Sequence, residues 1–217
     1  MKLIVLDVET TNSIDDPFMY DIGWSVCDTD GKVYLSRSFV VEEIFMDLEL
    51  MASAYFADKR SQYWEDIING SRIMARLYTI RAQLCEDCKA FDISIISAHN
   101  ASFDYRAMQY TQRFLTCSRF RWFVPFGVEM WDTLKMARKV FGKDEEYKQF
   151  CVENGYLNPN KSVKLTAEIL YRYITKNYDF VEAHTGLEDV QIEKEIFAEC
   201  WRRGCADGRL WDYAQDV

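Results

Sequence analysis

The chain has 217 residues, of which 49% are apolar, and its formal net charge is −9. This size predicts one large domain or one domain with an elaboration. The sequence contains no run of about 18 apolar residues, so no membrane-spanning helix is predicted. The negative charge argues against holding long duplex nucleic acid on a broad basic surface, although it leaves room for an enzyme that grips a short strand end.

Three strands are predicted at the start of the chain. The apolar run at 2–9 is typical of a buried strand, and two further strands at 20–28 and 32–41 are joined by the turn sequence TDGK. Together they predict a three-stranded meander. The intervening NSIDDPFM is predicted as a loop.

The segment 42–90 has helical periodicity. One amphipathic helix is predicted over 71–89, because apolar residues recur there at spacings of three and four. The preceding MASAYFADKRSQYWEDIING predicts shorter helical pieces. Its aromatic side chains are expected either to stack on bases or to fill a core; they are Tyr55, Phe56, Tyr63 and Trp64.

Strands and helices alternate in the rest of the chain. A β-branched run at 93–98 predicts a buried strand, 102–116 predicts a helix, and 131–142 predicts a strand end that runs into a helix. Two more helices are predicted at 164–174 and 187–203. This order predicts a mixed α/β sheet with helices on its faces.

The cysteines indicate a reducing compartment. Seven of them, an odd number, are scattered along the chain, which predicts free thiols in the cytosol. The first apolar run is cut by Asp7 and lacks a small-residue cleavage site, so no signal peptide is expected and the predicted location is cytoplasmic. Cys85 and Cys88 form a lone CxxC within a helical pattern, which we interpret as structural and not as a zinc or redox motif.

Asp7 and Glu9 lie at the end of the first predicted strand. Side chains of a strand alternate with period two, so both project from one face. Two poorly solvated carboxylates repel each other, and one takes up a proton unless a cation lies between them. The pair predicts a neighbouring arginine, lysine or divalent metal, unless the strand end is frayed and both acids face water.

Other acids and both histidines follow later elements. His99, Asn100 and Asp104 come directly after the fourth predicted strand, where open α/β sheets bind ligands. His184 and Asp189 lie at the start of the last predicted helix. Each alone fits a helix cap or a charge that compensates the helix dipole. Together, the four acids predict a site for two Mg²⁺ or Mn²⁺ ions that serves phosphoryl displacement, with a histidine as general base.

The motifs VLDVETT, SAHNASFD and HTGLED resemble, in order and separation, the three exonuclease motifs of the DEDDh (DnaQ-like) 3′→5′ exonucleases. The resemblance implies an α/β, RNase H-like fold with a five-stranded mixed sheet flanked by helices. It implies one exonuclease domain over 1–217, with a helical elaboration at 42–90. It also implies metal-binding roles for Asp7, Glu9, Asp104 and Asp189, a general-base role for His184, and substrate contacts for Thr10, Thr11, His99, Asn100 and Phe103.

The implied activity is metal-dependent removal of nucleoside 5′-monophosphates from the 3′ end of single-stranded DNA, with a polymerase or replication protein as an expected partner. The choice of DNA rests on the spelling of the motifs, and an RNA-trimming exoribonuclease or oligoribonuclease is the nearest alternative. A non-catalytic interaction module is a second alternative, but a degenerate copy is expected to lack an acid or the histidine. Asn12 departs from the glycine that the family often has there.

The stretch DYRAMQYTQRFLTCSRFRWF is rich in arginine and aromatic residues. Arg106 and Arg113 are seven residues apart and share a predicted helix face. Such residues suit single strands, because arginine binds phosphate and aromatic rings stack on bases. For the two arginines we favour an ordinary solvated helix face, and for residues 120–123 the sequence favours neither interpretation.

Overall fold

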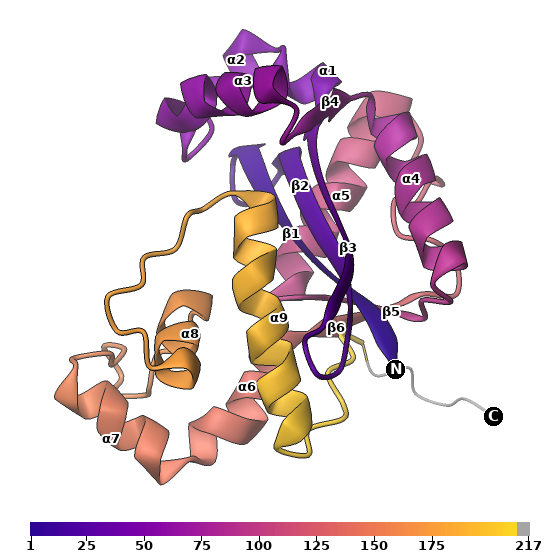
Figure 1. Cartoon of the computed structure of the whole chain (residues 1–217). Coiled ribbons are helices and arrows are strands. Elements are labelled where there is room, and N and C mark those ends of the chain that lie inside the picture. The colour runs from indigo at the N-terminus through magenta and orange to yellow at the C-terminus, as the bar shows by residue number, and fades with distance from the viewer. Residues whose placement is uncertain (212–217) are drawn as a thin grey trace.

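A mixed sheet of six strands forms the centre of the computed structural model, which describes residues 1–211 (Figure 1). The strands lie in the order β4-β3-β2-β1-β5-β6. β2 runs antiparallel to β1 and β3, whereas the β1–β5, β5–β6 and β3–β4 pairs are parallel. The bounds are Lys2–Asn12 (β1), Pro17–Asp28 (β2), Val33–Val41 (β3), Ile73–Ala75 (β4), Ile95–Ala98 (β5) and Glu129–Asp132 (β6).

β1 lies between β2 and β5 and is covered on both faces, which explains its continuous apolar run. Leu3 and Val5 belong to one core cluster, and Ile4 and Leu6 belong to the other. Because side chains alternate along a strand, Asp7 continues the row of Leu3 and Val5. This parity decides which helices the acids at the end of β1 face.

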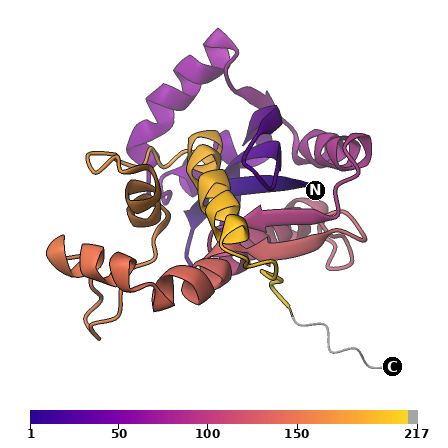
Figure 2. The same ribbon diagram turned by 60° about the horizontal axis from the view of Figure 1, so that its bottom comes forward.

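Helices cover both faces of the sheet. α4 and α5 pack on the face of Ile4 and Leu6, whereas α6 to α9 pack on the face of Leu3 and Val5. Figure 2 shows the orange and yellow helices of the second group apart from the magenta α4. The bounds are Leu77–Ala90 (α4), Ala101–Thr116 (α5), Thr133–Val140 (α6), Glu145–Glu153 (α7), Ala167–Thr175 (α8) and Gly186–Arg202 (α9), with a 3₁₀ turn at Phe141–Lys143 (η2).

Short helices follow β3, as the sequence predicts, and α2 and α3 lie beyond the carboxyl end of β1 (Figure 1). The aromatic residues of this segment have different surroundings. Tyr63 is fully buried, Trp64 packs partly buried against the core, and Tyr55 is exposed. The bounds are Glu42–Phe45 (α1), Leu48–Met51 (α2), Ala57–Lys59 (η1) and Arg60–Asn69 (α3).

The predicted helix over 71–89 is wrong at its start. Residues 73–75 form β4, which pairs with the free edge of β3, and α4 begins only at Leu77. The apolar spacings of three and four continue across this boundary by coincidence. The backbone of β4 pairs with β3 and so takes no part in a helix. The sheet therefore has six strands and not five, and the 42–90 segment is not purely helical.

The predicted loop NSIDDPFM is shorter than expected. β1 extends to Asn12 and β2 begins at Pro17, with a bulge in the register between Glu9 and Thr10. Pro17 is tolerated because it stands first in its strand, where a missing N–H costs little. No helix among residues 1–211 is long and apolar enough to cross a membrane.

A buried ion pair joins the 42–90 segment to the sheet. Asp21 of β2 is fully buried and accepts two hydrogen bonds from the Arg72 guanidinium, at 2.8 and 2.9 Å. It also accepts one from the Tyr63 hydroxyl at 2.7 Å and one from the backbone N–H of Gly186 at 2.9 Å. One carboxylate thus connects α3, the residue before β4, and the first residue of α9.

Two glycines allow the start of α9 to reach β2. A Cβ atom added at Gly23 would lie 2.2 Å from the backbone nitrogen of Leu187 and 2.4 Å from the carbonyl carbon of Gly186. A Cβ atom added at Gly186 would lie 2.7 Å from the Gly23 nitrogen. The backbones meet without side chains between them, which brings the first turn of α9 against the end of β1.

We expect Gly23→Ala to push α9 away from β2 and to lower the free energy of unfolding by about 3 kcal/mol, because backbone atoms cannot yield as a flexible side chain does. Urea denaturation measures the change. Gly142→Ala is the control, since nothing lies within 4 Å of a Cβ atom there. Equal stability of the two variants would contradict the close approach.

Candidate active site

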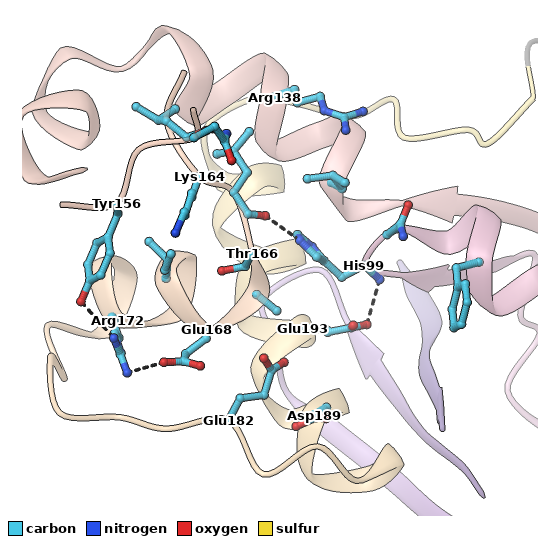
Figure 3. Close-up of a pocket in the computed structure, with 18 of the residues that line it drawn as sticks. His99, Arg138, Tyr156, Lys164, Thr166, Glu168, Arg172, Glu182, Asp189 and Glu193 are labelled. Atoms are coloured by element: carbon cyan, nitrogen blue, oxygen red, sulfur yellow. Dashed lines mark hydrogen bonds and ion pairs between the residues drawn. The ribbon is translucent and has the colours of Figure 1, made fainter. Parts of the chain in front are cut away.

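Five carboxylates of β1, α5 and α9 converge on one pocket of about 1330 Å³, which Glu168 and Glu182 also line. β1 supplies two of them from one face, the first turn of α5 supplies one, and α9 supplies two that are four residues apart and so share a helix face. Figure 3 shows the two acids of α9 directed into this pocket. The five are Asp7, Glu9, Asp104, Asp189 and Glu193.

Burial and mutual repulsion make these acids reluctant to ionise. Burial raises the pKa of Asp7 well above its ordinary value, and the charges of Glu193 and Asp104 add to this shift. Burial, followed by the charge of Asp189, raises the pKa of Glu9 from 4.5 to about 8. The pocket therefore holds acids whose ionised forms a cation would stabilise.

The other three acids have shifts of the same direction. Burial raises the pKa of Asp104 from 3.8 to about 8 and that of Asp189 from 3.8 to about 7, with Glu182 adding to the second shift. Burial and the charge of Asp104 raise the pKa of Glu193 well above 4.5. All five carboxylates would take up protons more readily than exposed ones.

Backbone N–H groups orient the buried acids. Asp189 accepts hydrogen bonds from the N–H of His184 at 3.2 Å and from that of Thr185 at 3.1 Å, which satisfies donors at the start of α9. Glu193 accepts one from the N–H of His99 at 3.0 Å. Neutral donors of this kind fix the geometry of the carboxylates but do not neutralise their charge.

Three residues form a group that could hold a metal ion. Ligand atoms of Glu9, His184 and Asp189 all lie within 4.8 Å of one another. With Asp7 and Asp104 in the same pocket, the donors are mainly carboxylate oxygens, which suit the hard cations Mg²⁺ and Mn²⁺. The raised pKa values fit the same interpretation, because a bound dication would restore the ionised forms.

The His184 ring is held by the 42–90 segment. It stacks on Phe56 with a centroid distance of 4.6 Å and an interplanar angle of 15°. The Lys59 ammonium donates hydrogen bonds to the carbonyls of Ala183 and His184. His184 itself has a left-handed backbone with φ of 52°. Burial, followed by the charge of Lys59, lowers the pKa of His184, which favours its neutral form.

Lys59 is also a cation beside the carboxylates. Its charge lowers the pKa of Glu9 and of Asp189, against the larger effect of burial. A single ammonium opposes part of the repulsion among five acids and leaves the rest. The electrostatics therefore still call for added positive charge.

The predicted substrate contacts fall into two groups. His99, Asn100 and Phe103 line the pocket, whereas Thr10 and Thr11 are not among the described residues that line it. The Thr11 hydroxyl bonds instead to the carbonyl of Leu50 and, at 2.9 Å, to the hydroxyl of Ser53. The extended hairpin of β1 and β2 carries Thr11 past the pocket and against α2.

Both ring nitrogens of His99 have protein partners. Nδ1 lies 2.9 Å from the Thr133 hydroxyl, and Nε2 lies 2.8 Å from the carbonyl of Leu165. Burial lowers the pKa of His99, and a neutral ring that donates from Nε2 satisfies both contacts. His99 therefore ties the end of β5 to the segment before α8.

Neither arginine of α5 is among the described residues that line this pocket. Arg106 lies over the Phe103 ring at 5.8 Å, and Arg113 lies over Trp122 at 5.3 Å. Phe120 is 82% exposed, whereas Phe123 is fully buried. The aromatic cluster near 120–123 thus divides between surface and core.

No family model matches the sequence, and no curated protein matches it. Solved structures match its fold. Exonuclease I from Methylocaldum szegediense aligns with a TM-score of 0.56 and 14% identity over 91% of this chain and 40% of that one. E. coli exonuclease I in complex with a 5cy-dT13 oligonucleotide aligns with a TM-score of 0.54 and 12% identity over 93% of this chain and 41% of that one.

A third structure is the Mg²⁺ and Mn²⁺ bound form of S. pombe Pop2p, with a TM-score of 0.50 and 10% identity over 93% of this chain and 83% of that one. The chain has an RNase H-like fold. This confirms the fold class predicted from the motifs, with six strands in place of five. The chain spans about two fifths of the two exonuclease I chains that it matches.

Three residues that the motifs do not name contribute to the candidate site: Glu193 and Phe56 line the pocket, and Lys59 contacts the backbone of His184. Glu193 follows Asp189 by one helical turn, a spacing that the sequence contains and that could have revealed it. Phe56 and Lys59 approach from a segment more than a hundred residues away from His184 along the chain, and no sequence pattern links them to it.

We expect the metal-free protein to lose stability as pH rises from 5 to 8. The native pKa of Glu9 and of Asp104 is about 8, so over this range the native state binds more protons than the unfolded state, and the free energy of unfolding falls with pH. The fall should exceed about 2 kcal/mol. Urea denaturation in EDTA at several pH values measures it.

Glu193→Gln should flatten this pH dependence, and exposed Glu153→Gln on α7 should not. Added Mg²⁺ should stabilise the native protein more at pH 8 than at pH 5.5, because protons compete with the ion. Stability that rises with pH in EDTA would contradict the repulsion among the carboxylates.

A second prediction concerns the ring stack. The chain has two histidines, so its proton NMR spectrum has two imidazole Hε1 resonances, and the one lost in His184→Gln belongs to His184. In Phe56→Leu this resonance should move downfield, because the ring current of Phe56 is gone, while that of His99 stays in place. An unmoved His184 resonance would mean that the rings do not stack in solution.

Proposed function

We propose that this protein is a divalent-metal-dependent nuclease that removes nucleoside 5′-monophosphates from the 3′ end of single-stranded DNA. One observation carries the proposal: carboxylates of β1, α5 and α9 meet beside His184 in a pocket of an RNase H-like fold. The fold neighbours support it, since one is an exonuclease in complex with a DNA oligonucleotide and another holds Mg²⁺ and Mn²⁺.

Asp7, Glu9, Asp104 and Asp189 would hold two such ions. When bound, the ions supply the positive charge that activates a water molecule and stabilises the leaving 3′ oxygen. The carboxylates fix the positions of these charges, because each belongs to a regular element; Asp104 and Asp189 are buried, and Asp7 and Glu9 are half-buried. Glu193 adds a fifth acid, held through the N–H of His99.

His184 takes the proton of the attacking water. Its lowered pKa keeps the imidazole in the neutral form that accepts a proton at neutral pH. The stacked Phe56 ring and the two bonds from Lys59 limit the movement of this residue. Asn100 and Phe103 line the same pocket, which supports the proposal that they contact the terminal nucleotide.

The finer parts of the proposal rest on the motifs. DNA as the substrate follows their proofreading-type spelling, and RNA is the alternative that the experiment below separates. Membership of the DEDDh group, association with a polymerase, a cytoplasmic location and a single domain over 1–217 likewise stay predictions.

The decisive assay follows 5′-labelled single-stranded DNA and RNA of one sequence with Mg²⁺, Mn²⁺ or EDTA. We expect ladders that shorten from the 3′ end, that need the metal and that form faster on DNA. Asp7→Asn should lower the rate about 10³-fold, since it removes a metal ligand, and His184→Gln should lower it about 10²–10⁴-fold.

Asp30→Asn, an exposed acid of the β2–β3 turn, is the matched control and should retain full activity. Circular dichroism checks that each variant is folded. Full turnover by folded Asp7→Asn would rule out the proposed metal site. Faster cleavage of RNA would reassign the substrate and leave the metal site intact.

A further inference from the structure

The pocket that holds the carboxylates continues well beyond them. Its other side is lined by α6, by the segment between α7 and α8, and by the first turns of α8. In Figure 3 the Lys164 amine projects into this part, on the other side of Thr166 from the carboxylates of Asp189 and Glu193. The pocket therefore has an acidic end and a second end of different character.

The second end contains five cations, and two of them are neutralised. Lys148 pairs with Glu145 at 2.6 Å. Arg172 pairs with Glu168 and donates to the Tyr156 hydroxyl at 2.9 Å. The other three take part in none of the ion pairs formed by the described residues, and we call them the basic wall: Arg138, Lys161 and Lys164.

The segment that carries the two lysines of the basic wall is held in shape by its own hydrogen bonds. Leu157 and Val163 form a β-bridge, and the Asn158 side-chain amide donates to the Ser162 hydroxyl at 2.9 Å. The Lys164 backbone donates to the carbonyl of Tyr156 at 3.0 Å and accepts from the Tyr147 hydroxyl at 2.6 Å. Lys164 thus projects from a fixed backbone.

One histidine fixes the two lysines of the basic wall relative to the acids. His99 donates from its backbone N–H to Glu193 at 3.0 Å, and its Nε2 lies 2.8 Å from the carbonyl of Leu165, the residue after Lys164. Both contacts are drawn in Figure 3. The acidic end and the basic wall are therefore parts of one framework.

We propose that the basic wall binds the phosphates of the nucleic-acid strand upstream of the bond that is cut. This inference rests on the proposed function. A chain with a net charge of −9 and a cluster of buried acids repels a polyanion, so unpaired cations in the same pocket give the strand a local attraction. The wall recognises the phosphodiester backbone and not the bases.

The test uses two substrates of different length. The p-nitrophenyl ester of thymidine 5′-monophosphate needs the carboxylates but is too short to reach the wall, whereas dT12 reaches both. The wall variant is Arg138→Gln, Lys161→Gln, Lys164→Gln. The control variant is Lys32→Gln, Lys89→Gln, Lys176→Gln, which removes the same charge from exposed lysines outside the pocket.

We expect the wall variant to raise KM for dT12 at least tenfold and to hydrolyse the ester as the wild type does. The slope of log KM against log salt should fall by about 2, since three phosphate contacts are lost. The control variant should change neither slope nor KM by as much. Equal effects of the two variants on dT12 would overturn the inference, and so would equal loss of the ester and dT12 activities in the wall variant.

A binding measurement separates this inference from the proposed function. Fluorescence anisotropy of labelled dT12 with Ca²⁺ needs no catalysis. If the wild type cuts neither substrate but binds dT12 more tightly than the wall variant does, the wall stands and the nuclease proposal fails. If the wild type cuts dT12 and the wall variant binds and cuts it equally well, the nuclease stands and the wall is overturned.

Discussion

The contact of Arg72 Nη1 with both carboxylate oxygens of Asp21 joins three parts of the molecule at one buried point. The same carboxylate receives the N–H of Gly186, so the first residue of α9 is attached to β2 by charge as well as by packing. Asp189 lies one turn further along that helix. If the ion pair were broken, an unpaired buried charge would remain, at a cost of about 3–5 kcal/mol, and α9 would lose its position beside β1.

That attachment opposes a strong repulsion. Five buried or half-buried carboxylates with raised pKa values disfavour the folded state as they ionise. Within residues 1–211, Lys59 is the cation whose charge lowers the pKa of both Glu9 and Asp189. The rest of the fold holds the acids together through close backbone approach at Gly23, through N–H donors, and through two apolar cores. Cations bound from solution would reduce the repulsion among these carboxylates.

The 42–90 segment is part of this arrangement and not only an addition to the fold. It supplies β4, which widens the sheet, Arg72, which anchors α9, and Phe56 with Lys59, which hold His184. Its aromatic residues therefore divide among the core, the surface and the histidine. Changes in this segment should affect the site through His184, even where they touch no carboxylate.

The sequence by itself determined the parts that depend on local spacing. Period two placed Asp7 and Glu9 on one face, motif order placed Asp104 and Asp189 at the starts of two helices, and the three motifs together predicted the fold class that the structure confirms. The strands at the start of the chain and the long helices α5 and α9 were predicted from the spacing of apolar residues. That spacing reflects the face of each element that is buried.

Only the tertiary structure decided which distant residues meet. The strand β4 depends on the free edge of β3, the Thr11 hydroxyl depends on α2, and the partner of His184 is a ring from a separate segment. The three cations of the basic wall have no distinguishing pattern in sequence. The segment of Lys161 and Lys164 shares a pocket with the acids because His99 joins the backbone of Leu165 to the end of β5, and Arg138 reaches the same pocket from α6. Contacts of this kind depend on distances through space, which no local pattern contains.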